Sequence, residues 1–253
     1  MAGPEGDEAI SYAPAAAPVG VPQTAMQVRT MTVTEAVRRR RSIRAFLPTA
    51  VPEALLREVL DAARWAPSGS NIQAWKIVAV AGAERDAVVR MALESMGTPS
   101  MASKDEFPIY PPDLWEPLRT RRYTLAEDMY RALGIPREDK PARLRHVARN
   151  FELFGAPVGL FFVIDRRVAH GQWAHLGMLI QTVALLLEER GLGCCMQEAW
   201  AQFRPQLAAR FGLPPDEMVY CGMAVGHPDP TRPVNDFPRT RITVDELAEF
   251  RGF

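Results

Sequence analysis

The sequence lacks the net charge that a polyanion would attract. Its 253 residues include 30 Lys and Arg and 30 Asp and Glu, so the formal net charge at pH 7 is zero. This balance excludes the global attraction by which nucleic-acid-binding proteins and proteins of anionic membrane surfaces reach their partners. We therefore expect no nucleic acid and no membrane as a partner, and any basic feature has to be local.

The chain also lacks a long hydrophobic run. Its longest apolar stretches, at 158–164 and 183–187, fall well short of the ~20 residues that cross a bilayer. Residues 1–22 carry acids where a signal peptide carries bases, and they have no apolar central run. These absences exclude a transmembrane helix and argue against export.

Cysteine is scarce, and the common cofactor motifs are missing. Cys194, Cys195 and Cys221 cannot all be paired, adjacent cysteines rarely bridge each other, and no CxxC pair suggests zinc. We therefore expect a reducing, cytoplasmic location and no metal site. The GxGxxG, Walker and HExxH patterns are absent as well, which leaves no standard nucleotide or zinc-protease motif.

What the sequence does contain suffices for one elaborated domain or two small ones. Its 47% hydrophobic and 24% charged residues are typical of a globular protein, and a domain of this size buries roughly 75% of the surface of its unfolded chain. Residues 1–27 are rich in Ala, Pro and Gly with almost no periodicity, so we expect a flexible tail. The folded domain is predicted over residues 28–253.

Apolar periodicity in the first third of this domain predicts helices around one strand. Thr34 is expected to cap a short helix, and Pro52 to begin a second helix that stops at Pro67. The β-branched run at 75–81 predicts a strand, and helical spacing returns at 82–96.

The middle of the chain predicts an insertion followed by buried strands. Many prolines, and then two helices expected at 120–133 and 140–154, indicate an inserted cap over residues 98–150. Near-continuous apolar runs at 157–165 and 218–226 predict central strands that are buried on both faces.

The helix predicted at 171–190 is apolar nearly all round. Leu176, Leu179 and Val183 belong to one stripe, while Met178 and Leu185 lie off it. Two interpretations remain open: a helix buried within one domain, or a helix covered by its own sheet on one side and by a partner subunit on the other.

The densest charge feature is the run of arginines at 38–44. Taken alone, it is typical of a solvated surface or one that contacts RNA. Its end alternates polar and apolar residues, so Arg40, Ser42 and Arg44 are expected to project together from an extended segment. Guanidinium groups beside a hydroxyl suit a phosphate, to which arginine offers bidentate donors.

A tight turn rich in hydroxyls and amides, at 66–75, lies between a predicted helix and a predicted strand. It can be a plain connecting loop. However, Asn71 and Gln73 offer both donor and acceptor atoms, which the edge of a flat heterocycle requires, and Gly69 permits a close approach of the backbone.

Four motifs occur in a distinctive order and spacing: RRSIRAF at 40–46, PSGSNIQAW at 67–75, GLGCCMQEAW at 191–200 and the segment 226–253. They resemble the motifs of the FMN-dependent nitroreductase family. The resemblance is greatest to the nitrobenzoate-reductase-like members with an inserted cap. It implies an α+β fold, a mixed β-sheet flanked by helices, in an intertwined homodimer whose C-terminal extension over 228–253 wraps the partner.

The same resemblance implies an FMN site. Residues from both ends of the chain would hold the phosphate, and Arg44 would reach the N1 and O2 side of the isoalloxazine ring, where a permanent positive charge stabilises reduced flavin. The ring would lie between two subunits, with the loop over 67–71 supplied by the partner. The phosphate residues would be Arg40, Ser42, Arg239 and Arg241. The full set of cofactor-binding residues would be Arg40, Arg41, Ser42, Arg44, Pro67, Ser68, Gly69, Ser70, Asn71, Gln73, Gln197, Glu198, Ala199, Arg239 and Arg241.

No side chain is implied to be catalytic, because the flavin would carry the chemistry at its N5 atom. Backbone N–H groups of Gln197, Glu198 and Ala199 would lie beside N5. Two departures from the family pattern bear on this region: Ala74 replaces a frequent proline, and Glu198 and Ala199 stand where a glycine is frequent.

We assign no chemical role to the cysteines and histidines. Cys194 and Cys195 read as small packing residues after a buried helix. The histidines are too few and too badly spaced for a metal site, so His146, His170 and His175 are expected to be ordinary surface or packing residues, and no role is assigned to His227.

The activity implied by the resemblance is NAD(P)H-dependent reduction of a nitroaromatic, or of a similar small electron-poor aromatic, by a ping-pong mechanism. Within the enzymes, the alternatives are a reductive dehalogenase or a flavin-fragmenting enzyme on the same scaffold. Outside them, the alternatives are a non-catalytic flavin-binding protein and a nucleic-acid-associated protein that uses the arginines at 38–44.

Overall fold

The computed structural model describes residues 31–96, 111 and 113–253. Its centre is a four-stranded sheet in the order β1-β2-β4-β3. All strand pairings are antiparallel, and the parallel component in the described residues is an isolated bridge between Ser42 and Cys194. The strands are β1 (Trp75–Ala81), β2 (Val158–Asp165), β3 (Gly193–Gln197) and β4 (Glu217–Gly226).

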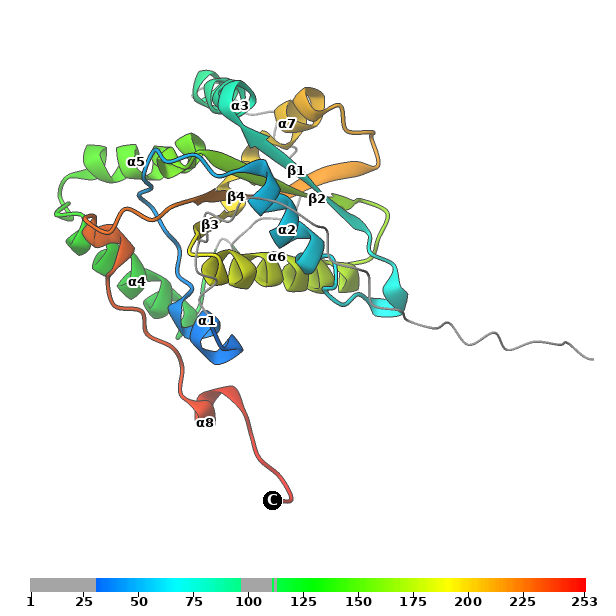
Figure 1. Ribbon diagram of the computed structural model, residues 1–253. Helices are drawn as coiled ribbons and strands as arrows, with labels where there is room; N and C mark the ends of the chain where they lie inside the picture. The colour runs from blue at the N-terminus through cyan, green and yellow to red at the C-terminus, as the bar shows by residue number, and fades with distance from the viewer. Residues whose placement is uncertain (1–30, 97–110, 112) are drawn as a thin grey trace, which may run out of the picture.

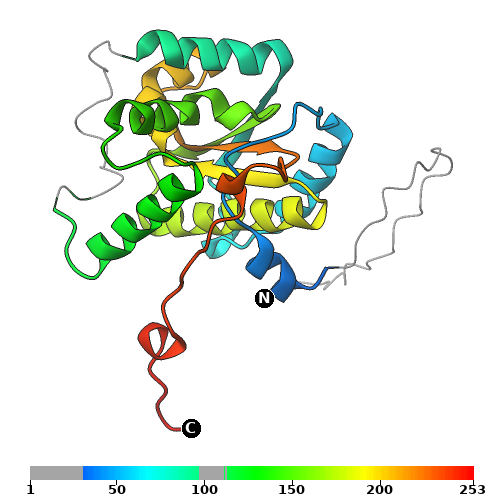
Figure 2. The same cartoon turned by 90° about the vertical axis from the view of Figure 1, so that its left-hand side faces the viewer.

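Helices cover both faces of the sheet, which confirms the predicted α+β fold (Figure 1). α3 and α7 pack on one face and α2 and α6 on the other, and the second view again shows α3 and α6 on opposite sides of the sheet (Figure 2). The α-helices are α1 (Val33–Arg39), α2 (Glu53–Ala63), α3 (Gly82–Ser95), α4 (Leu118–Ala132), α5 (Lys140–Ala148), α6 (Gly171–Glu189), α7 (Arg204–Phe211) and α8 (Val244–Leu247). The 3₁₀ helices are η1 (Gly69–Asn71), η2 (Arg149–Gly155), η3 (Glu198–Phe203) and η4 (Pro233–Asn235).

The two middle strands are buried on both faces, as their apolar runs predict. Successive side chains of a strand point to opposite faces. In β2, Leu160 and Phe162 therefore pack in the core cluster with α2 and α6, while Phe161 and Val163 pack in the cluster with α3 and α7. β4 contributes to both clusters in the same way, so one sheet organises two cores.

The apolar stripe of α6 is confirmed. Leu176, Leu179 and Val183 are buried against the sheet, whereas Met178 is 44% exposed on the other side of the helix. In a single chain, α6 is thus covered on one side, and its second side is available to a partner.

Two local predictions are wrong. The cap of α1 is Thr32 and not Thr34: the Thr32 hydroxyl accepts from the Glu35 N–H at 3.2 Å, and the Glu35 carboxylate accepts from the Thr32 N–H at 2.8 Å, a complete capping box. The helix predicted over 140–154 ends at Ala148, because the chain tightens into η2, where Leu153 and Phe154 adopt left-handed backbone angles with φ of 53°. Both side chains are buried, which holds this turn in place.

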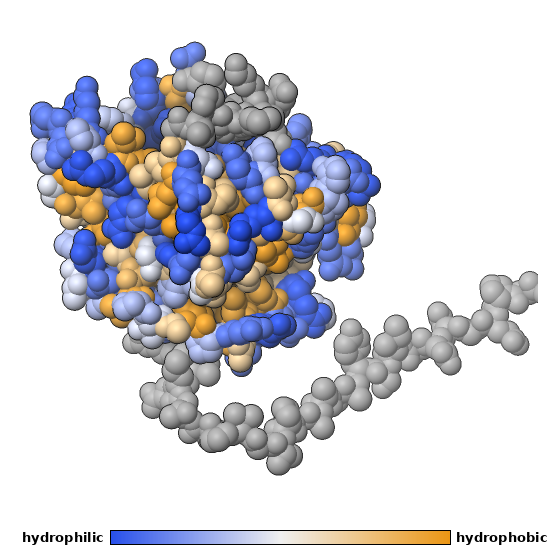
Figure 3. Space-filling model, turned by 90° about the horizontal axis from the view of Figure 1, so that it is seen from above, coloured by the Kyte–Doolittle hydropathy of each residue, from blue (hydrophilic) through white to orange (hydrophobic). Residues whose placement is uncertain are grey.

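The predicted tail over residues 1–27, and the cap's first part, lie outside the described residues. Within the described ranges, no helix has the length and apolarity needed to cross a membrane. The face seen in Figure 3 interleaves hydrophilic and hydrophobic residues wherever grey atoms do not cover it. Single exposed apolar side chains of this kind are ordinary for a protein surface.

Candidate active site

Arginines from the two ends of the chain meet in one small pocket. The Ser42–Cys194 bridge fixes the segment after α1 against the edge strand β3, and the segment after β4 returns to the same place. The pocket has a volume of about 100 Å³ and collects the predicted phosphate residues from both segments. It is lined by Arg40, Arg41, Ser42, Arg44, Leu125, Val234, Asn235, Phe237, Arg239 and Arg241.

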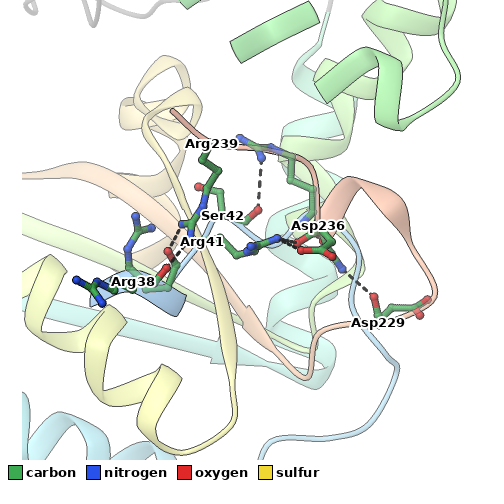
Figure 4. A network of polar contacts seen from close by, with 9 residues as sticks. Arg38, Arg41, Ser42, Asp229, Asp236 and Arg239 are labelled. Carbon is green, nitrogen blue, oxygen red and sulfur yellow. Dashed lines mark hydrogen bonds and ion pairs between the residues drawn. The ribbon is translucent and has the colours of Figure 1, made fainter. Parts of the chain in front are cut away.

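The C-terminal arginine Arg239 joins the two segments. Its guanidinium donates to the carbonyl of Arg38 at 2.7 Å and to the carbonyl of Arg40. Arg41, on the N-terminal segment, forms an ion pair in the other direction with Asp236, and Figure 4 shows these two side chains pointing toward each other. The charge of Arg41 is therefore already paired within the chain.

Asn235 is a structural member of the pocket that sequence reasoning missed. Its side chain accepts from the backbone N–H of Arg44 at 2.8 Å and donates to the carbonyls of Ala45 at 2.8 Å and Asp229 at 3.0 Å. Its own carbonyl accepts from Arg41 at 2.8 Å. Asn235 thereby fixes the backbone that carries the arginines, and no local pattern could reveal a contact across 191 residues of sequence.

The pocket holds more positive charge than the chain itself neutralises. Burial lowers the pKa of Arg239, and the neighbouring charges of Arg41, Arg241 and Arg40 lower it further. Like charges held this close repel each other, so an anion bound among them would be strongly favoured. The predicted grouping of Arg40, Ser42, Arg239 and Arg241 thus has the electrostatics of a phosphate site.

A larger cavity of about 670 Å³ adjoins this pocket, and Arg44 lines both. One wall comes from the end of β3 and the start of η3, a second from α6, and a third from the cap helices α4, α5 and η2. The lining residues are Arg44, Met129, His146, Val147, Asn150, Phe154, Gly177, Ile180, Gln181, Cys195, Met196, Gln197, Glu198, Ala199, Tyr220 and Cys221.

The residues predicted beside flavin N5 line this cavity, and their side chains differ in what they do. Gln197 is 2% exposed, donates to the carbonyl of Asn150 at 2.7 Å and accepts from the indole N–H of Trp200 at 3.3 Å. Its side chain thus ties β3 to the base of the cap. Glu198 makes no such tie, and partial burial raises the pKa of its carboxyl group.

The three cysteines are unpaired and buried. Burial raises the pKa of Cys194 to about 12, and it also raises the pKa values of Cys195 and Cys221. These thiols therefore stay protonated at neutral pH, although the latter two line the cavity. The interpretation of Cys194 and Cys195 as packing residues agrees with this burial. Among the described residues, no group of His, Cys, Asp and Glu could hold a metal ion.

The predicted loop over residues 67–73 does not line either cavity. Its Gly69 N–H lies 3.4 Å from Nδ1 of His175, near the start of α6, whereas Arg39 contacts Glu188 at the helix end. These two contact points are about 20 Å apart along the helix axis. The loop residues Pro67, Ser68, Gly69, Ser70, Asn71 and Gln73 are therefore distant from the arginine pocket of their own chain.

The conformation of this loop is specific. Ser70, Asn71 and Gln73 all have φ between 51° and 54°, which non-glycine residues adopt uncommonly. The Gln73 side chain donates to the Asn71 side-chain oxygen at 2.9 Å, so the two amides form one exposed group. Backbone strain of this kind is concentrated at functional sites, so it favours a binding loop over a plain connecting loop.

His146 is a cavity residue whose environment sequence reasoning missed. It is 6% exposed, and burial together with the charges of Arg44 and Arg149 lowers its pKa to about 4. Its helix is rich in charges, and the sequence predicts an ordinary surface or packing residue there. The only local hint was the four-residue spacing to Asn150, which placed both residues on one helix face.

The fold and the site together define an α+β protein with a cationic pocket that adjoins a larger cavity. The sequence model of the nitroreductase family matches residues 37–227. Nitrobenzene nitroreductase of Ectopseudomonas oleovorans is 34% identical over 218 residues, which cover 86% of this chain and 96% of that protein. The 4-nitrobenzoate reductase of Pseudomonas putida is 34% identical over 214 residues, 85% of this chain and 93% of that protein.

A solved structure of a nitroreductase is similar to this chain as well. The FMN and NADPH-dependent nitroreductase NfnB from Sphigopyxis sp. strain HMH is 39% identical and superposes with a TM-score of 0.85, covering 88% of this chain and all of that chain. The chain belongs to the nitroreductase family. The family resemblance of its four motifs is thereby confirmed.

Proposed function

We propose that this protein is an FMN-dependent oxidoreductase that takes hydride from NAD(P)H and passes it to a nitroaromatic or a similar electron-poor aromatic acceptor. Its relatives are named for nitrobenzene and 4-nitrobenzoate, and the solved relative is FMN and NADPH-dependent. The observation that carries the proposal is the convergence of Arg40, Arg239 and Arg241 on a pocket that shares Arg44 with a larger cavity.

The residues present fit FMN. A phosphate dianion would offset the repulsion that lowers the Arg239 pKa, and Ser42 adds a hydroxyl to the guanidinium donors. When bound, FMN supplies the chemistry of hydride acceptance and donation at N5. Arg44 would hold a permanent positive charge at the N1 and O2 side of the ring, and the backbone of Gln197, Glu198 and Ala199 would face N5.

A homodimer would complete the site. The loop with Asn71 and Gln73 presents its amides away from both cavities of its own chain, so a second copy is needed to bring it to a flavin. Large apolar side chains are exposed on the same loop, just after α2, on α6 and on α1. They are Ile72, Trp65, Met178, Val33 and Val37. A partner that covers them would remove this apolar area from water.

The remaining segments have proposed roles as well. The cap helices α4 and α5 cover the cavity, and residues 228–253 wrap the partner subunit. Three buried, unpaired thiols favour a reducing compartment, in line with a cytoplasmic location.

The kinetic mechanism should be ping-pong. NAD(P)H and the acceptor would use the same cavity in turn, because no standard nucleotide motif that would indicate a second site occurs in the sequence. The purified protein should contain FMN, double-reciprocal plots for NADPH and nitrobenzene should be parallel, and each substrate at high concentration should inhibit competitively against the other. Initial rates measured over a grid of both concentrations provide the test.

Other outcomes would favour other functions. Intersecting lines would mean that the acceptor has a separate site. An FMN-loaded protein that NADPH does not reduce would contradict the proposal and point to a non-catalytic flavoprotein. A protein that NADPH reduces but that no nitroarene reoxidises would point to a differently specialised flavoprotein. Halide release from a halogenated phenol would favour a reductive dehalogenase.

A further inference from the structure

One polar group in the cavity has no internal partner. Among the cavity-lining residues that the structure describes, His146 alone carries a buried side-chain nitrogen, Nε2, without a hydrogen bond. Its neighbour Asn150 differs: the Asn150 amide donates to the Val147 carbonyl at 2.9 Å and accepts from Gln197. A buried polar atom without a partner is costly, so a ligand that supplies one is favoured.

The cap holds the imidazole in a fixed place. The ring of His146 packs edge-on against Tyr130, with centroids 6.0 Å apart, and lies 5.8 Å from the ring of Phe154. Tyr130 is itself covered by the guanidinium of Arg143 at 4.2 Å. Arg143 makes a two-bond ion pair with Glu127, at 2.6 and 2.9 Å, which joins α5 to α4. A ring clamped in this way loses little entropy when it binds a ligand.

The charge of the site indicates what the ligand is. His146 faces Arg44 and Arg149 and stays neutral at physiological pH, because burial and these two charges lower its pKa. A neutral imidazole has one N–H donor and one acceptor nitrogen. Apart from Arg44, which we assign to the flavin, no described lining residue is a cation, and Glu198 stands on the opposite wall.

We propose that His146 is the specificity residue of the acceptor site, and that its imidazole N–H orients the nitro or carbonyl oxygen of an uncharged, electron-poor arene beneath the cap. Anionic arenes such as 4-nitrobenzoate are the poorer acceptors, because the described residues that line the cavity offer them no unassigned cation. This inference rests on the proposed function, for which it names the substrate class and a cap residue that selects it.

Separate half-reactions provide the test. FMN-loaded protein is first reduced with NADPH in a stopped-flow instrument and then mixed with nitrobenzene or 4-nitrobenzoate while the flavin absorbance is followed. In His146→Phe, the apparent affinity for nitrobenzene in the reoxidation half-reaction should fall by roughly three- to tenfold, the worth of one hydrogen bond. The rate of flavin reduction by NADPH is measured separately, so an effect on the donor is distinguished from one on the acceptor. His146→Gln keeps a donor and should recover part of the loss.

A second readout does not depend on turnover. The chain has 4 histidines, so selective ¹⁵N-histidine labelling gives a spectrum in which His146→Gln identifies the His146 signals. Acetophenone, an uncharged arene with a carbonyl oxygen, should shift these signals in the oxidised holoenzyme, whereas benzoate at equal concentration should not. His170→Gln is the matched control: His170 also packs against an aromatic ring, that of Trp173, but it lines neither cavity.

Each contrary result has a distinct meaning. Equal reoxidation rates in His146→Phe and wild type, or a change confined to NADPH reduction, would overturn the assignment of His146 to the acceptor. Faster reoxidation of the wild type by 4-nitrobenzoate than by nitrobenzene would overturn the preference for uncharged arenes. A wild-type flavin that no nitroarene reoxidises would overturn the proposed function instead, and the acetophenone titration would still test His146.

Discussion

The arginines of the arginine pocket differ in how many hydrogen bonds and ion pairs they already make within the chain. Arg41 is paired with Asp236, and Arg239 donates to two backbone carbonyls, so removal of either would disturb the fold as well as the pocket. Arg241 makes a single described hydrogen bond, to the carbonyl of its neighbour Thr240 at 2.7 Å, and is exposed. Arg241 therefore reports on the ligand most cleanly.

Arg241→Ala should weaken FMN binding by about tenfold or more, because one charge-assisted hydrogen bond to the phosphate is lost. The thermal stability of the FMN-free protein should not change, since no packing is removed. Fluorescence titration of FMN into the stripped protein measures the affinity. Arg251→Ala, which removes an exposed arginine paired with Glu249 in the same segment, should leave the affinity unchanged. Equal affinities in Arg241→Ala and wild type would remove Arg241 from the phosphate site.

At the residue scale, the sequence revealed the groups whose chemistry is visible in their type. Clustered arginines beside a hydroxyl indicate an anion wherever they fold, so the resemblance of Arg40, Ser42 and Arg239 to a phosphate motif agreed with their chemistry. Asn235 escaped notice, and the sequence predicts His146 only as a surface or packing residue, because their environments come from contacts made only in the folded chain. A histidine in a charged helix has no pattern that distinguishes a buried ring from a solvated one.

At the element scale, β4 and η3 pack so closely that a larger side chain does not fit between them. Gly222 lies opposite Gln197 in the strand register, and a Cβ atom added there would stand 2.5 Å from Cδ1 of Trp200. The indole cannot move aside easily, because it is fully buried and packs edge-on against Phe151 and Phe161 with centroid distances of 5.5 and 5.1 Å. Glycine is required at this position for space rather than for backbone angles.

Gly222→Ala should lower the free energy of unfolding by about 1–3 kcal/mol, the usual cost of overpacking a closed core. Urea unfolding should show a lower midpoint with an unchanged slope. Gly171→Ala is the matched control: it makes the same change at the exposed start of α6, where nothing lies within 4 Å, and it should not lower the midpoint. A Gly222→Ala midpoint equal to that of wild type would mean that the Trp200 ring has freedom that its packing does not suggest.

The strands and the core helices could be predicted from periodicity alone, whereas the turns could not. Apolar runs long enough to fill both cores, such as those of β2 and β4, have few alternatives to a buried central strand. The predicted α5 extends too far, because Leu153 and Phe154 continue its apolar spacing. Their left-handed backbone angles accompany burial in the core beside the sheet. The boundary thus depends on tertiary packing, which a local pattern does not contain.

At the scale of the whole molecule, the single chain leaves its C-terminal segment without support. After η4 the chain runs away from the body, as both ribbon views show, and the short α8 is joined to the cap by an ion pair between Arg121 and Glu246 at 3.0 Å (Figures 1 and 2). Its Leu247, Phe250 and Phe253 are all more than half exposed. The second copy that we propose would cover these side chains and remove them from water.

The shared site makes a prediction that mixing can test. The hypothesis is that each flavin site combines the arginines of one subunit with the 67–73 loop of the other. Under this hypothesis, the Arg241→Ala homodimer and the Asn71→Ala homodimer both have impaired sites. The two chains nevertheless carry complementary defects. In a mixed dimer one site receives both defects and the other receives neither. Random reassociation of equal amounts should therefore restore about a quarter of the sites to wild-type FMN affinity. The two homodimers, each mixed with itself, are the controls.

Titration of FMN into the reassociated mixture would show a tight and a weak class of sites. A site built within one chain would give a different result, because every site in the mixed dimer would carry a single defect and no tight class would appear. Sedimentation of the wild type at sub-micromolar concentration provides a third test. A stable monomer that carries FMN under these conditions would contradict the dimer itself. The separation of the loop from the arginine pocket along α6 favours the first result, because no rotation of a side chain spans about 20 Å.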